Sequence, residues 1–103
     1  MDIGKISKEV YQLQKKRVSE LGSELTPELV FLHLSEEVGE IARQLVNKNL
    51  AIREYEESNL KEEIVQAILD LLVLSEIHNI DLSEASTRKI QEMARRHKEP
   101  NHT

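Results

Sequence analysis

The 103-residue sequence contains no cysteine, no tryptophan and only three aromatic residues. The absence of cysteine excludes disulfide bonds and thiolate chemistry. The scarcity of aromatic residues and of alternating β-branched residues argues against a β-sheet. No apolar run approaches the roughly 20 residues of a membrane span, and the opening "MDIGKISKEV" lacks the apolar core of a signal peptide. We therefore expect a cytoplasmic protein with no membrane partner.

The chain is acidic, with a formal net charge of −5. This charge makes nucleic acid an improbable general partner, because the phosphate backbone would be repelled. A content of 39% hydrophobic and 32% charged residues is ordinary for a soluble helical protein. The length, and the lack of repeats or linkers, predict a single all-α domain over residues 1–103, with a loose C-terminal tail over residues 98–103.

Helix start and stop signals divide the sequence into four helices. An apolar stripe runs from Ile3 to Leu21, and Gly22 follows as a stop signal. Thr26 is a predicted N-cap with Pro27 at the first helical position of a second helix, which ends near residues 47–49.

A polar connection over residues 50–58 with a short helical turn is predicted to lead into the third helix. That helix begins at Ser58 or Asn59 and ends at residues 78–79. Asp81 and Glu84 form the pattern of a capping box that opens the fourth helix. We predict a small four-helix bundle.

The predicted third helix is apolar nearly all round except for one polar line. At about 100° per residue, Glu63, Gln66 and Asp70 fall within about 60° of one another. A helix of this kind is expected to be buried on most sides, so the polar line should face inward or into a cleft. Because three short helices cannot cover such a helix, we expect a second subunit to complete the bundle as a C2 dimer, or as a tetramer of two dimers.

The predicted second helix carries a matching acidic segment, "SEEVGE". On the helical wheel, Glu37 and Glu40 flank the apolar face, whereas Glu36 points outward. If the two helices face each other, four carboxylates converge: Glu37, Glu40, Glu63 and Asp70. Their mutual repulsion is relieved either by protons or by a divalent cation. A ligand set made only of oxygen selects Mg²⁺ first, with Mn²⁺ or Ca²⁺ as alternatives.

Ordinary structural roles compete with this interpretation. A glutamate-rich helix face is most often solvated surface, and a buried carboxylate can pair with a lysine or arginine of the first helix. His33, one turn before Glu37, is either a ligand or partner of the site or a polar residue at the edge of the core.

The pattern "EEVGE" (Glu36, Glu37, Glu40) followed by "EEIVQ" resembles the EExxE…ExxD signature of the MazG-like all-α nucleoside triphosphate pyrophosphohydrolases. The dimeric dUTPases and phosphoribosyl-ATP pyrophosphatases are relatives of this family. The resemblance implies a MazG-like bundle in which Glu37, Glu40 and Glu63 hold Mg²⁺. Gln66 stands where the family has aspartate, and Asp70, one turn further on, is the candidate substitute.

The resemblance also implies a reaction, in which water attacks the α–β linkage of a nucleoside triphosphate and releases the monophosphate and pyrophosphate. Glu36 or Glu37 would accept the proton of that water. The basic segment "TRKIQEMARRHK" supplies Lys89 and Arg96, seven residues apart on one helix face, as the predicted phosphate contacts. The alternative is a non-catalytic helical oligomer that binds nucleotides or proteins and has lost activity through Gln66.

Overall fold

The chain forms four α-helices in the computed structural model, which describes residues 2–50 and 56–98. The helices are α1 (Ile3–Glu20), α2 (Pro27–Leu50), α3 (Glu57–Ile77) and α4 (Leu82–Lys98). The described residues contain no strand, which confirms the predicted all-α class. The connection expected over residues 50–58 and the tail expected over residues 98–103 lie largely on residues 51–55 and 99–103, outside the described residues. Leu50 belongs to α2, α3 begins at Glu57, and Lys98 is the last residue of α4.

The first two helix boundaries follow the predicted signals. Gly22, just after α1, has a φ of +80°, a left-handed conformation that glycine adopts without steric cost. At the start of α2, the backbone N–H of Leu29 donates to Oγ1 of Thr26 over 3.2 Å. This bond confirms Thr26 as the N-cap with Pro27 as the first helical residue.

The structure contains one half of the capping box that was predicted for the start of α4, namely the half formed by the Asp81 side chain. The backbone N–H of Glu84 donates to Oδ1 of Asp81 over 3.1 Å, so Asp81 is the N-cap. The carboxylate of Glu84 instead pairs with the guanidinium of Arg88, one turn later on the same helix. The second half of the predicted capping box is therefore replaced by an ion pair at spacing i, i+4.

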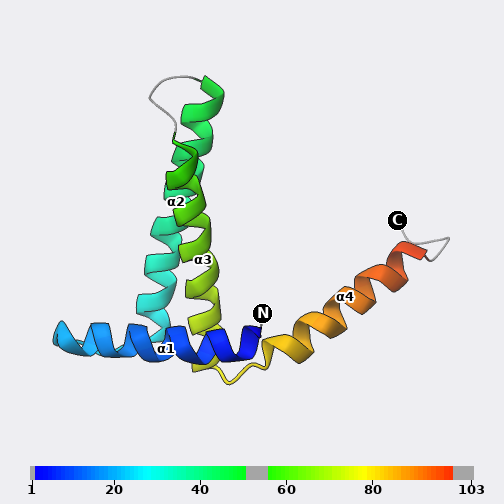
Figure 1. Ribbon diagram of the computed structural model, residues 1–103, viewed down its shortest axis with the longest axis horizontal. Helices are drawn as coiled ribbons and strands as arrows, with labels where there is room; N and C mark the ends of the chain where they lie inside the picture. Colours follow the sequence, from blue (N-terminus) through cyan, green and yellow to red (C-terminus); the bar gives the residue numbers. More distant parts are fainter. Residues whose placement is uncertain (1, 51–55, 99–103) are drawn as a thin grey trace.

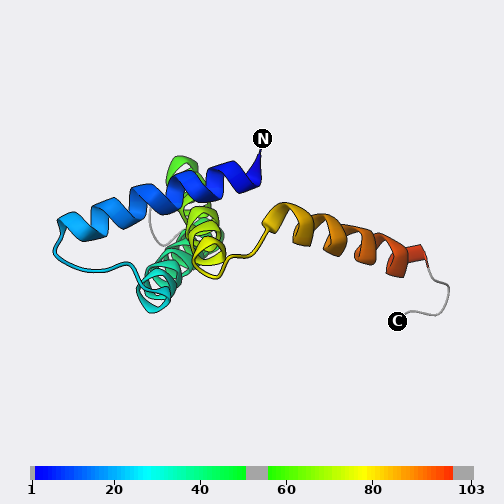
Figure 2. The same cartoon turned by 90° about the horizontal axis from the view of Figure 1, so that it is seen from below.

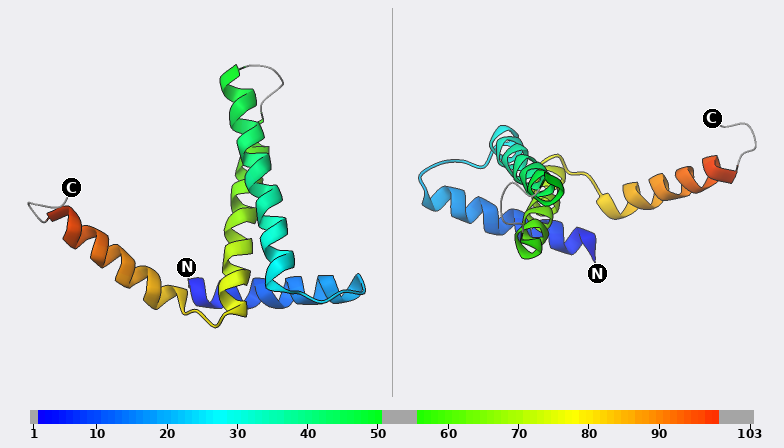
Figure 3. Two further views of the ribbon diagram at one scale, coloured as in Figure 1. Left: turned by 180° about the vertical axis from the view of Figure 1, so that it is seen from behind. Right: turned by 90° about the horizontal axis from the view of Figure 1, so that it is seen from above.

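Helices α2 and α3 lie side by side and run in opposite directions, and α1 crosses their lower end (Figures 1 and 2). Helix α4 leaves this group and extends into solvent, which the views from behind and above also show (Figure 3). The radius of gyration is 17.3 Å, compared with about 13 Å for a compact domain of this length. The single chain is thus an open assembly of three packed helices and one projecting helix.

Within the isolated chain, α4 does not pack against the α2–α3 pair, so the completion of the predicted four-helix bundle by a second subunit stays a prediction. Asn79 has a φ of 57°, which ends α3 in a left-handed conformation and turns the chain away from the α2–α3 pair. Only a short connection follows before Leu82 begins α4. Ile90 and Met93 on α4 remain 65% and 59% exposed as a result.

The core of the single chain is small. Among the described residues, the buried apolar side chains are Val30 on α2 and Ala67 and Val73 on α3. The expectation that α3 is buried nearly all round is not met within one chain, because α1 and α2 cover only one side of it. The uncovered side carries four apolar residues that are 41–51% exposed, namely Ile64, Val65, Ile68 and Leu71.

Helix α2 has a matching uncovered stripe. Phe31, Val38 and Leu45 are 58%, 53% and 44% exposed, and their spacing of seven residues places them on one helix face. Several large apolar side chains exposed along one face of a helix are typical of a protein–protein interface. None of the described helices combines the length and apolar character needed to cross a membrane.

Candidate functional site

The antiparallel pairing of α2 and α3 places the polar residues of one helix opposite those of the other. Across this contact, Nδ1 of His33 on α2 lies 2.7 Å from Oδ2 of Asp70 on α3. Glu37 is one turn further along α2, and Glu36 is exposed on the outer side of that helix. The predicted orientations of Glu36, Glu37 and the polar line of α3 are therefore confirmed.

Asp70 is the most buried charged residue described, with 3% of its surface exposed. Its second oxygen, Oδ1, accepts a hydrogen bond of 3.0 Å from Nε2 of Gln66. An ionised carboxylate only accepts hydrogen bonds, so Nδ1 of the imidazole is the donor when Asp70 is ionised. A buried carboxylate is costly without such donors, so these two contacts explain how α3 tolerates an acid at this position.

The contacts of Asp70 also fix its neighbours. The amide of Gln66 is held by its nitrogen, which leaves its carbonyl oxygen on the opposite side of the amide group. The second imidazole nitrogen of His33, Nε2, lies 3.7 Å from Oε1 of Glu37, a distance too long for a hydrogen bond. His33 thus contacts Asp70 directly and lies near Glu37 at the edge of the core.

Glu63 lies half-buried on α3, one turn before Gln66. Its Oε2 atom is buried and has no hydrogen-bond partner among the described residues. A buried carboxylate oxygen without a donor costs free energy, and a bound cation would remove that cost. This unpartnered oxygen is the feature of the structure that best fits a metal ligand.

Glu40 has a different environment. Its Oε1 atom accepts a bond of 2.5 Å from Nη2 of Arg43 on the same helix, and both side chains are partly exposed. An exposed pair of this kind contributes little to stability, so the carboxylate can exchange the guanidinium for another cation.

The predicted ligands are not gathered into one set here. Within residues 2–50 and 56–98, no three histidine, aspartate or glutamate side chains lie close enough together to hold a metal ion. The oxygen-only donor set of Glu37, Glu40 and Glu63, with the unpartnered oxygen of Glu63, nevertheless suits a hard divalent cation. The metal-binding role of these residues, and of Asp70, stays a prediction.

The structure does not bring the predicted phosphate contacts to these acids within one chain. Lys89 and Arg96 lie on α4, which projects away from the α2–α3 pair (Figure 1). Nζ of Lys89 is 3.8 Å from Oε1 of Glu92 on the same helix. The role of Lys89 and Arg96 as phosphate contacts stays a prediction.

A cleft of about 290 Å³ opens between α1 and the α2–α3 pair. Its walls are mainly apolar and include Val18, Leu21, Leu29 and Val73. Polar residues from all three helices meet in it, namely Gln14, Arg17, His33, Glu37, Gln66 and Asp70. The partly buried contact of His33 with Asp70 therefore borders an open cleft.

The contribution of α1 to this cleft was missed by the sequence analysis. The signal was present, because Gln14, Arg17, Val18 and Leu21 recur at the spacing of one helix face. Two polar residues beside two apolar ones on such a face are also typical of a surface helix. Only the crossing of α1 over α2 and α3 shows that this face lines a cleft.

The comparison with models of known protein families shows to which family the chain belongs. A model of the MazG nucleotide pyrophosphohydrolase domain matches residues 25–100. The chain belongs to the MazG family. This membership confirms the resemblance inferred from the acidic motifs. No curated protein and no solved structure gave a significant match.

The region matched to the MazG domain includes some of the site residues and leaves out others. It includes α2, α3 and α4, and hence every predicted metal ligand and phosphate contact. It does not include α1, which supplies Gln14 and Arg17 to the cleft. The predicted acidic residues thus lie within the matched region, and the cleft wall on α1 precedes it.

Proposed function

We propose that this MazG-family protein is a Mg²⁺-dependent pyrophosphohydrolase that converts nucleoside or deoxynucleoside triphosphates to the monophosphate and pyrophosphate, in a house-cleaning role. The observation that carries the proposal is the membership of the family, together with Glu37 of α2 and Asp70 of α3, which line the same cleft. The unpartnered buried oxygen of Glu63 supports the same proposal. The site combines an anionic lining with an adjoining cleft, as a metal–nucleotide complex requires.

The predicted ligands of the cation are Glu37, Glu40 and Glu63, with Mn²⁺ as an alternative to Mg²⁺. When bound, the cation would neutralise charge on the phosphates and polarise the attacking water. Asp70 is the fourth predicted ligand, and its contact with Gln66 sets the orientation of that amide. Gln66 would then offer a neutral carbonyl oxygen where the motif has an anionic one, which weakens cation binding without abolishing it.

Glu37 is the better supported of the two candidate bases. It is half-buried and borders the cleft, whereas Glu36 is exposed on the outer side of α2. A base must lie within hydrogen-bond reach of the water that it deprotonates. The position of Glu37 meets this requirement for a substrate in the cleft, and Glu36 would have to act from outside it.

The proposal includes a homo-oligomer. The exposed apolar residues of α2 and α3 form a surface that a second copy would cover as a C2 dimer, from which a tetramer could be built. In such a dimer, α4 of one chain could supply Lys89 and Arg96 to the phosphates bound by the other. The projection of α4 in the single chain supports this exchange of side chains between copies.

The deciding experiment measures pyrophosphate release from a panel of ribo- and deoxyribonucleoside triphosphates with Mg²⁺ or Mn²⁺. We expect turnover of at least one substrate, loss of turnover with a chelator, and a higher melting temperature with the cation. No turnover across the panel, together with no effect of either cation on the melting temperature, would refute the enzyme and favour the non-catalytic alternative.

A further inference from the structure

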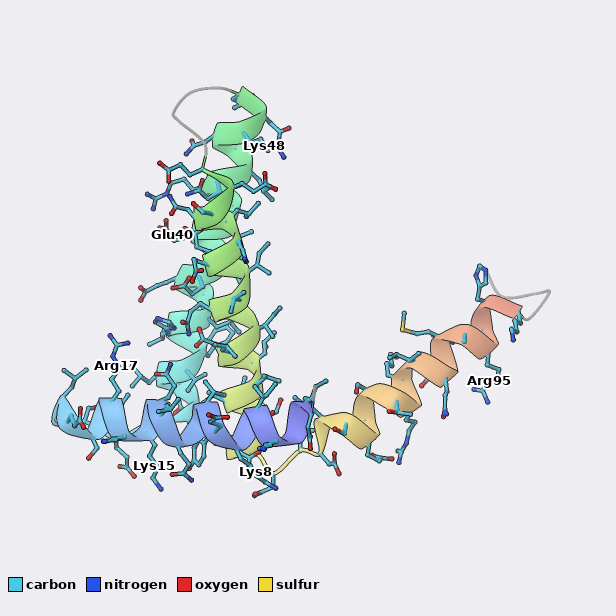
Figure 4. The ribbon with its side chains drawn as sticks, in the orientation of Figure 1. Lys8, Lys15, Arg17, Glu40, Lys48 and Arg95 are labelled. Atoms are coloured by element: carbon cyan, nitrogen blue, oxygen red, sulfur yellow. The ribbon has the colours of Figure 1, made fainter. Side chains whose placement is uncertain are left out.

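The polar face of α2 continues beyond the residues of the acidic motif. Gln44 lies four residues after Glu40 and seven after Glu37, so on the helical wheel it falls within about 40° of both. All three residues are half-buried. Figure 4 shows Glu40 and Lys48 on the part of the α2–α3 pair that lies away from α1, and Gln44 stands between these two positions along α2. The acidic motifs assign no role to Gln44.

The amide oxygen of Gln44 has the same unsatisfied state as one oxygen of Glu63. Within residues 2–50 and 56–98, the buried side-chain polar atoms without a hydrogen-bond partner are Oε1 of Gln44 and Oε2 of Glu63. Both are acceptors when Glu63 is ionised, so neither can satisfy the other. A buried acceptor without a donor costs free energy. Each oxygen therefore lacks a donor or a cation that the described side chains do not supply.

The register of the helix pair brings these two oxygens toward each other. His33 contacts Asp70 across α2 and α3, which run in opposite directions (Figure 1). About two turns from this contact, seven residues along each helix, lie Glu40 on α2 and Glu63 on α3. Gln44 is one turn beyond Glu40, about 6 Å along the axis. Because helical side chains lean toward the N-terminus of their own helix, Gln44 and Glu63 lean toward each other.

Hydrogen-bond donors are distributed unequally along this contact. Near α1, both oxygens of Asp70 already have partners, namely His33 and Gln66. About two turns away, no described residue donates to Oε1 of Gln44 or Oε2 of Glu63. A cation at this second position would satisfy two free oxygens, whereas at the first it would have to displace the present partners of Asp70. The unsatisfied part of the contact is therefore the better place for a cation.

We infer that Gln44 is a ligand of the proposed divalent cation, and that its amide oxygen binds the ion together with the carboxylate of Glu63. The presence of the cation rests on the proposed function, but Gln44 belongs to none of the motifs on which that function was proposed. Mg²⁺ and Mn²⁺ accept carbonyl oxygens alongside carboxylates. The oxygen of Gln44 thus adds a ligand to a set in which Gln66 brings no negative charge.

Binding of Mn²⁺ in the absence of nucleotide tests the inference directly. The full chain is titrated with Mn²⁺ by calorimetry, and wild type is compared with Gln44→Met. This substitution keeps the length of the side chain and removes the oxygen without a change in charge, so long-range electrostatics cannot explain a loss. We expect the affinity to fall about tenfold.

Gln12→Met, the same change at an exposed position of α1, is the matched control and should bind Mn²⁺ as the wild type does. If water alone fills the space beside Gln44, the affinity of Gln44→Met will equal that of the wild type. That result would overturn the inference, and so would a wild-type chain that binds no Mn²⁺.

Melting curves in chelator separate a metal ligand from an amide with a structural role. Because Oε1 of Gln44 is buried without a donor, Gln44→Met should leave the metal-free melting temperature unchanged or raise it. Gln44→Glu should lower that temperature, since it adds a carboxylate near Glu63, and should bind Mn²⁺ more tightly than wild type. A lower melting temperature for Gln44→Met, with unchanged Mn²⁺ affinity, would assign the amide to the fold and overturn the inference.

Pyrophosphate release is measured separately, so the inference and the proposed function fail separately. A chain that releases pyrophosphate while Gln44→Met retains full Mn²⁺ affinity would keep the function and lose this ligand. A chain in which Gln44→Met weakens Mn²⁺ binding, but no triphosphate is hydrolysed, would keep the ligand and lose the enzyme.

Discussion

The imidazole of His33 and the carboxylate of Asp70 join α2 to α3 through a contact of 2.7 Å between residues 37 positions apart in the sequence. The contact satisfies one oxygen of a carboxylate that is 3% exposed, while Gln66 satisfies the other. It therefore anchors the helix pair on which the acidic residues stand. Its removal tests how far the site depends on this anchor.

His33→Ala should destabilise the protein by about 1–3 kcal/mol, because it leaves a buried oxygen of Asp70 without a donor. Denaturant unfolding followed by circular dichroism measures this loss. His78→Ala is the matched control, since His78 is exposed at the C-terminal end of α3 and caps it through its backbone. Equal losses for the two variants would show that the His33–Asp70 contact contributes nothing specific.

Glu63→Gln should reduce pyrophosphate release by at least tenfold and weaken the stabilisation by Mg²⁺, because it removes the anionic ligand with the unpartnered buried oxygen. Without metal, the same substitution should leave stability unchanged or raise it. Glu62→Gln, the same change at the neighbouring exposed position, is the control and should retain activity. Turnover and thermal shifts with and without chelator measure both effects, and full activity in Glu63→Gln would contradict its assignment as a ligand.

Gln66→Asp should have opposite effects in the two metal states. Without metal, it replaces a donor to Asp70 by a second carboxylate, so the melting temperature should fall. With Mg²⁺ or Mn²⁺, the additional anionic ligand should lower the metal concentration needed for half-maximal activity. Melting curves in chelator and in a metal titration show both. A variant that behaves alike in the two states would place Gln66 away from the metal.

Ile68→Glu should disrupt the oligomer, because it places a charge in the centre of the exposed apolar side of α3. Light scattering after gel filtration should show the wild-type chain at a multiple of 11.9 kDa and the variant at the monomer mass. Leu13→Glu on α1, also at an exposed apolar position, should retain the wild-type mass. A monomeric wild-type chain would exclude the proposed dimer.

Lys89→Ala/Arg96→Ala should lose activity, and mixing with the Glu63→Gln chain should restore it. In a mixed dimer, one site combines intact acids from one chain with intact cations from the other. Statistical reassembly should recover about a quarter of wild-type turnover. Each variant reassembled alone is the control. Recovery on mixing would place the cations on the partner chain. Lost activity without recovery would place them in the same chain as the acids. Undiminished activity in the double variant would exclude both residues as phosphate contacts.

The sequence by itself determined the helices, because their boundaries depend on local interactions. Thr26 caps α2 and Asp81 caps α4 with a hydroxyl or carboxylate three residues from its donor, and the stop at Gly22 needs only a residue that tolerates a positive φ. The orientation of Glu36, Glu37 and Asp70 also followed from helical periodicity alone. The acidic motifs were sufficient to indicate the MazG family.

The tertiary structure decided what depends on contacts between distant segments. Whether Asp70 would meet a cation, an arginine or a histidine could not be read from the sequence, since all three can satisfy an oxygen of a buried carboxylate. The direction of α4 after Asn79 separated Lys89 from the acids of its own chain. The crossing of α1 made a cleft from residues whose spacing indicated only an amphipathic helix. Such packing depends on the fit of whole helix surfaces, which no local pattern contains.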